Sequence, residues 1–113
     1  MLIVREKISI DEIKRIARET FGTVVKAVVD VEKGIIAIGG ELHSDEEAEL
    51  LATGSKQENL WGINIYPDAA GEDFIEFDSL INLRPSQGNR TRGVDNPSVR
   101  QKIIEIVTNL IVR

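Results

Sequence analysis

The stretch TVVKAVVDVEKGIIAIGGEL, residues 23–42, decides the fold, because two β-branched runs flank the tripeptide Glu32-Lys33-Gly34. Runs of valine and isoleucine bounded by turn-forming residues are typical of β-strands. Gly34 stands where a tight turn between two strands needs a positive φ angle. We therefore expect a β-hairpin at residues 23–42, and with it an antiparallel sheet.

Three helices are expected outside this hairpin. The sequence of residues 9–12 has the form of a capping box, and apolar residues then recur at helical spacing until Gly22. Residues 44–47 form a second capping box, which predicts a helix that runs to about Ala52. Asn96-Pro97 supplies an N-cap and a first-turn proline for a third helix near the end of the sequence.

Three further strands are expected, at residues 2–4, 60–67 and 74–85. In the last of these, the odd-numbered positions from 75 to 83 are apolar except for a serine, and most even-numbered positions are polar, as in a sheet with one packed face. The packed parity is Ile75, Phe77, Ser79, Ile81 and Leu83. We predict one α+β domain over residues 1–113, with a mainly antiparallel sheet of about four to five strands and three helices packed on one face.

The composition limits the classes of function. Hydrophobic residues make up 42% of the chain, which is ordinary for a folded domain, and the formal net charge of −5 opposes general nucleic-acid binding. There is no cysteine, which excludes thiolate catalysis and Cys-ligated zinc, and no apolar segment is long enough to span a membrane. A cytoplasmic protein without a cofactor is the default expectation.

Polar residues of one parity gather on one face of the expected sheet. They are Lys26, Asp30, Glu41, His43, Asn64, Tyr66, Glu76, Asp78, Asn82 and Arg84. A sheet that faces water on one side needs polar residues there, so a solvated face explains most of this pattern. A binding surface remains the alternative.

The segment INLRPSQGNRTRGVDNPSV, residues 81–99, carries a local reversal of charge. Arg84, Arg90 and Arg92 lie within nine residues that contain no acid. Guanidinium groups suit carboxylates and phosphates, and a turn at Gln87, Gly88 and Asn89 could direct backbone N–H groups inward. An anion-binding pocket is therefore one interpretation, with Asn64, Tyr66 and Asn82 as further contacts. The alternative is that the arginines pair with nearby carboxylates and hold the loop in place.

A second candidate site is acidic. Glu41 and His43 point to the same side if their strand continues that far, and Glu76 and Asp78 provide further carboxylates. A carboxylate with an imidazole can serve as an acid/base pair or as half of a metal site, most plausibly for Mg²⁺ or Mn²⁺. His43 is the only histidine, which excludes multi-histidine zinc sites. These residues define an alternative function, a metal-assisted hydrolase.

The last helix suggests a third alternative. Its core stripe is widened by Ile104 and Ile111, which could cover the sheet or meet a second copy of the chain. A self-associating or partner-binding module is therefore also considered. Trp61, the only tryptophan, is expected as a core anchor.

The segments GGELHSDEE, SKQENLWGINIYP and IEFDSLINLRPSQGNRTRG occur in this order, and the chain containing them resembles a small prokaryotic family of unknown function. WGINIYP and RPSQGNRTRG are the most distinctive parts of this resemblance. It implies a compact domain of bacteria or archaea and assigns no catalytic residue. The leading hypothesis is a small binding protein for an anionic ligand, either a small molecule or the acidic segment of a protein partner.

Overall fold

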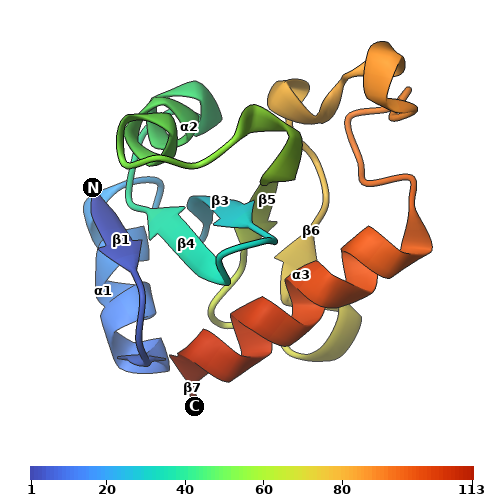
Figure 1. Cartoon of the computed structure of the whole chain (residues 1–113). Helices are drawn as coiled ribbons and strands as arrows, with labels where there is room; N and C mark the ends of the chain where they lie inside the picture. Colours follow the sequence, from blue (N-terminus) through green and yellow to red (C-terminus); the bar gives the residue numbers. More distant parts are fainter.

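The computed structural model describes residues 1–113 and contains a five-stranded sheet in which all neighbouring strands are antiparallel (Figure 1). The strand order is β1-β4-β3-β5-β6. The strands are β1 (Leu2–Val4), β3 (Val25–Asp30), β4 (Ile35–Ile38), β5 (Leu60–Ile65) and β6 (Ile75–Glu76). The expected hairpin is confirmed as β3 and β4, with Gly34 at a φ of 68° in the connecting turn.

The three expected helices are confirmed as α1 (Ile10–Glu19), α2 (His43–Ala52) and α3 (Pro97–Leu110). The Ser9 side chain accepts from the backbone N–H of Glu12 at the start of α1, and Asn96 caps α3 in the same way. Two short strands, β2 (Ile8–Ser9) and β7 (Ile111–Val112), pair in parallel and join the ends of α1 and α3. No helix is long and apolar enough to cross a membrane.

The expected capping box at Ser44 does not form. The helix α2 begins two residues earlier than a cap at Ser44 requires, at His43, with Leu42 as its N-cap and no side-chain hydrogen bond to the cap. His43 is buried, and its Nε2 lies 2.7 Å from the carbonyl oxygen of Ile63 on β5. This contact holds His43 against β5, and His43 becomes the first residue of α2.

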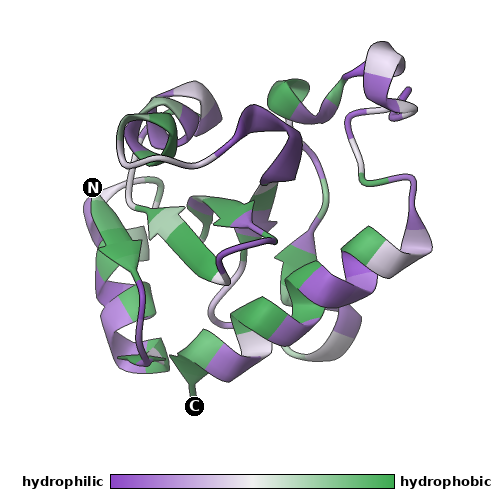
Figure 2. Ribbon diagram, viewed as in Figure 1, coloured by the Kyte–Doolittle hydropathy of each residue, from purple (hydrophilic) through white to green (hydrophobic).

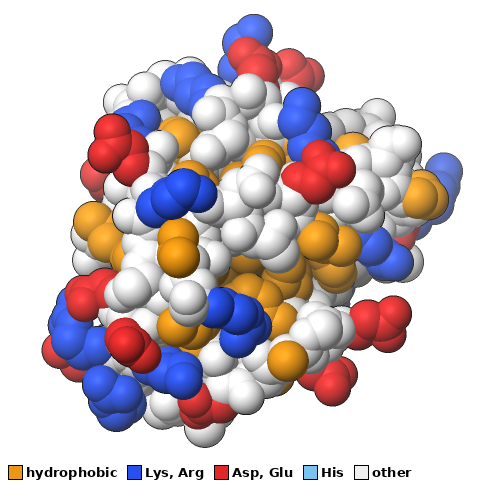
Figure 3. Space-filling view, turned by 90° about the horizontal axis from the view of Figure 1, so that it is seen from below, with side chains coloured by type: hydrophobic (Ala, Val, Ile, Leu, Met, Phe, Trp, Pro, Cys, Tyr) orange, Lys and Arg blue, Asp and Glu red, His pale blue; other side chains and the backbone are white.

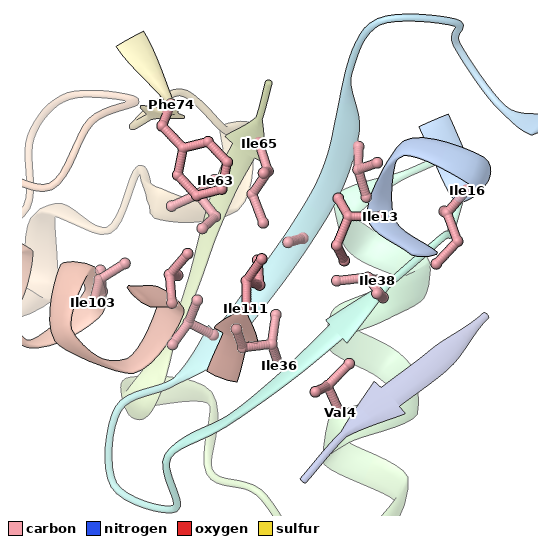
Figure 4. Packing of buried hydrophobic residues seen from close by; sticks show 14 of the residues in the cluster. Val4, Ile13, Ile16, Ile36, Ile38, Ile63, Ile65, Phe74, Ile103 and Ile111 are labelled. Carbon is pink, nitrogen blue, oxygen red and sulfur yellow. The ribbon is translucent and has the colours of Figure 1, made fainter. Parts of the chain in front are cut away.

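The helices are divided between the two faces of the sheet, which corrects the prediction that all three pack on one face. A cluster of 17 buried residues joins α1 and α3 to one face, and its side chains interdigitate in Figure 4. A smaller cluster joins Leu50 of α2 to Val28, Ile35 and Ala37 on the opposite face. The physical reason is that β4 is apolar at both parities, as Figure 2 shows, and that Val28 of β3 adds apolar surface on the second face. A strand that is apolar on both sides is covered on both sides.

The predicted strand over residues 74–85 is mostly wrong, because β6 ends at Glu76 and two 3₁₀ turns follow, η3 (Leu80–Asn82) and η4 (Pro85–Gln87). After β6 the chain crosses closely over β5 at Gly62. A Cβ atom at Gly62 would lie 2.6 Å from the side chain of Ser79, so only glycine permits this approach. The remaining 3₁₀ turns are η1 (Gln57–Asn59) and η2 (Gly71–Asp73).

Candidate functional site

Asn82, from the segment predicted to bind an anion, completes the edge of β5. Its Oδ1 accepts from the backbone N–H of Gly62 at 2.8 Å, and its Nδ2 donates to the Gly62 carbonyl at 2.9 Å. The same amide nitrogen donates to the carbonyl of Arg92 at 2.9 Å. Asn82 is fully buried, so its amide replaces the neighbouring strand that β6 no longer provides at this position.

Arg84 continues the same edge two residues further on. Its guanidinium donates to the carbonyls of Gln57 and Leu60, the latter at 2.7 Å. The central carbon of this guanidinium, Cζ, lies 4.2 Å from the centre of the Trp61 ring. Burial lowers the pKa of Arg84 from its usual value. The two terminal nitrogens of this arginine are therefore directed at the protein's own backbone, and its buried Nε has no partner. Trp61 is buried in the main core, as expected.

Asn89 organises the loop from within. It is buried, and its Nδ2 donates to three carbonyls of the loop, those of Asn82, Thr91 and Gly93. Its backbone pairs with that of Arg84 in an antiparallel bridge. Gly88 completes the turn with a φ of 83°, and Gln87 donates outside the loop, to the carbonyl of Glu58 at 2.7 Å. These residues hold the loop in one conformation.

The other two arginines of the loop, Arg90 and Arg92, differ in whether their side chains have a partner within the chain. Arg92 Nε lies 2.6 Å from a carboxylate oxygen of Asp78, as in the interpretation that the arginines hold the loop in place. The Arg90 side chain is exposed and has no hydrogen bond or ion pair, although its backbone N–H donates to Asp95. Hydrogen bonds from the Thr91 hydroxyl and from this N–H lower the pKa of Asp95. Arg90 is therefore the one loop arginine whose guanidinium is free.

The four residues of the candidate acidic site do not converge. Glu41 is exposed, His43 is directed at a backbone carbonyl, and Asp78 pairs with Arg92. Burial lowers the pKa of His43, which favours its neutral form. Glu76 accepts hydrogen bonds from two other residues, described below. No group of three or more His, Asp or Glu side chains is arranged to hold a metal ion.

Asn64, Tyr66 and Glu76 meet on the face of the sheet that carries α2, as the predicted polar parity requires. Asn64 Nδ2 donates to a carboxylate oxygen of Glu76 at 2.9 Å, and the Tyr66 hydroxyl donates to the same oxygen at 3.2 Å. The amide nitrogen of Asn64 also donates to the carbonyl of Asp78. Their polar atoms satisfy one another.

A groove of about 1010 Å³ lies elsewhere, between α3 and the segment that contains η2 and β6. Its exposed apolar surface comes from Ile75, Phe77, Ile104 and Val112, and the core residues Phe74 and Ile111 line it with little exposed surface. A volume of this order is at the upper end of the range typical of small-molecule sites. Figure 3 shows apolar side chains at the surface of this side of the molecule, with Lys and Arg side chains beside them.

Three cations border this groove, and none forms an ion pair within the chain. Lys7 donates to the carbonyl of Asn109 at 2.9 Å. Arg100 lies 5.1 Å from the centre of the Phe77 ring, and Arg113 lies 4.4 Å from that of Phe74. The one carboxylate that lines the groove is Glu72. An acidic protein therefore presents a locally cationic, apolar groove.

No local sequence pattern predicts this groove. Lys7 and Arg100 are far apart in the sequence, and the return of α3 beside β2 and β6 brings them together. The available signal was Ile104, which lies outside the core stripe of α3 and is half-buried at the groove. Ile111, in contrast, is 5% exposed and belongs to the core, so it is not part of an exposed surface.

Comparison with known protein families gives one match, over residues 2–110, to the model of a protein family of unknown function, DUF5674. The chain belongs to the DUF5674 family. This match confirms the expected membership in a family of unknown function. It covers the loop and the groove except for Ile111, Val112 and Arg113, which also line the groove. No curated protein and no solved structure matches the DUF5674 chain.

Proposed function

We propose that this protein binds a ligand that has an apolar body and an anionic group, and that the ligand occupies the groove between α3 and β6. The observation that carries the proposal is the presence of three cations without carboxylate partners around an apolar cavity of about 1010 Å³. Exposed apolar surface favours a ligand that covers it, and a desolvated anion gains most beside unpaired cations. The proposal keeps the expected anionic ligand but moves it from the loop to the groove.

The loop supports this change of site, because Arg84 and Arg92 already have partners within the chain. Arg90 alone offers a free guanidinium there, on an exposed surface outside the groove. The hydrolase alternative has no comparable support, since its residues do not converge. A cytoplasmic location and a bacterial or archaeal source remain part of the proposal, and both rest on the sequence alone.

The test uses a matched pair of probes, the dye anilinonaphthalene sulfonate and its uncharged analogue phenylnaphthylamine. We expect saturable fluorescence enhancement of the anionic dye with one site per chain. Arg100→Gln should weaken its binding about five- to tenfold, as the loss of roughly 1 kcal/mol implies, and should leave the uncharged analogue nearly unaffected.

Arg18→Gln is the control, because Arg18 is an exposed arginine of α1 that does not line the groove. It should change neither dye. Equal weakening by the two variants, or no saturable binding to the wild-type protein, would contradict the proposal. Near-UV circular dichroism of each variant, which is lost when specific side-chain packing is lost, tests whether a loosened core is the source of dye binding.

A further inference from the structure

The strand β6 has a free backbone edge. It is the last strand of the sheet, and the backbone N–H of Tyr66 donates to the carbonyl of Phe74 at 2.9 Å. Hydrogen-bonded and non-hydrogen-bonded pairs alternate along an antiparallel ladder, so the next pair, Ile65 with Ile75, is of the second kind. The N–H and C=O of Ile75 therefore point away from β5, to the outer side of the sheet.

The same edge is covered further along the chain. The backbone N–H of Ser79 donates to the carbonyl of Arg92 at 2.9 Å, so residues 91–93 run beside the chain that follows β6. This cover does not extend to Ile75, which has no strand on its outer side. Unpaired strand edges are templates for pairing with another chain, and folded proteins usually protect them.

The groove lies along this open edge. Ile75 lines it together with Phe77, and Ile104 of α3 lines it as well. A strand added to β6 would direct every second side chain to the face of the sheet on which α3 packs. Arg100 and Lys7 at the groove favour acidic residues in such a strand, whereas the acidic surface of the rest of the protein would repel them.

We propose that the natural ligand of the groove is an extended, acidic segment of a partner protein, which adds to β6 as a further strand and pairs with the backbone of Ile75. This inference rests on the proposed function and specifies its ligand. It combines three features of one site: a backbone donor and acceptor in need of partners, apolar surface for alternate side chains, and cations for carboxylates. A lipid-like anion would satisfy only the last two.

The test is to select, from a random peptide library displayed on phage, the peptides that bind the purified full chain. We expect the selected peptides to carry acids together with apolar residues at alternate positions. With a synthetic peptide of the selected sequence, hydrogen exchange of the Ile75 amide should slow by about tenfold or more, because this amide gains a hydrogen bond. Arg100→Glu should weaken peptide binding by about tenfold or more, whereas the control Arg18→Glu should not.

The outcomes separate this inference from the proposed function. If no peptide is selected, or if selected peptides bind without protecting the Ile75 amide, strand addition is overturned. Should the anionic dye still bind with its dependence on Arg100 in that case, the groove remains a site for small anionic ligands. Failure of both the dye and the peptides overturns both proposals.

Discussion

Replacement of Asn82 by alanine should be among the most destabilising changes in the chain outside the apolar core. The substitution removes three hydrogen bonds from a side chain that is fully buried, two of them to the backbone of Gly62. A typical hydrogen bond contributes about 1 kcal/mol net, and a buried group left without a partner costs about 1–3 kcal/mol. We expect the free energy of unfolding to fall by about 3–5 kcal/mol, a large part of the ~5–15 kcal/mol typical of a domain.

Urea titration followed by tryptophan fluorescence measures this loss, because the only tryptophan neighbours Gly62 on β5. With a slope of about 2 kcal/mol per molar urea, the midpoint should fall by about 1.5–2.5 M. Gln87→Ala is the control, since it removes one exposed hydrogen bond and should cost less than about 0.5 kcal/mol.

A second variant at the same position tests the geometry itself. Asn82→Asp keeps an acceptor for the Gly62 N–H but turns an oxygen toward the carbonyls of Gly62 and Arg92, so it should be at least as unstable as the alanine variant near neutral pH. An Asn82→Ala protein within about 1 kcal/mol of the wild type would refute the role of Asn82 at the edge of β5.

Two further predictions concern buried positions. Gly62→Ala should lower the free energy of unfolding by about 1–3 kcal/mol in the same assay, because its methyl group would lie 2.6 Å from the Ser79 side chain. Gly93→Ala is the control, since its methyl group meets no atom closer than 3.4 Å and it should destabilise the protein less. Equal losses in the two variants would count against the close crossing at Gly62. Burial raises the pKa of Glu46 to about 9 from an ordinary value of 4.5, so the folded state holds a proton that the unfolded state releases, and stability should fall as the pH rises between these values. Glu46→Gln should flatten this dependence and should be more stable than the wild type at about pH 8. If the free energy of unfolding from urea titrations changes with pH equally in the variant and the wild type over this window, Glu46 is not protonated in the folded state.

Much of the fold follows from local patterns. The β-branched runs around Gly34 identify the central hairpin, and the caps at Ser9 and Asn96 identify two helix starts to the residue. These features depend on neighbouring residues only, so they are readable in the sequence.

The errors arose where tertiary contacts override local patterns. The alternation in residues 74–85 predicted a strand, but Gly62 allows the chain to leave the edge of β5 and cross over the sheet. Two interpretations were open for the arginines of the loop, and Arg92 follows the second, because it pairs with the nearby carboxylate of Asp78. Arg84 instead donates to the backbone carbonyls of residues 57 and 60, which are distant in the sequence and which only the fold brings near.

The groove was not predictable for the same reason, since it combines Lys7, the residues around β6 and one face of α3. The most direct test of its role is a two-dimensional ¹H–¹⁵N NMR titration of the labelled protein with dodecanoate, an anion with an apolar chain. We predict that the largest shifts map to the amides of Ile75, Phe77, Ile104 and their neighbours. Shifts concentrated in residues 84–92, or no shifts that saturate, would contradict the assignment of the groove as the binding site.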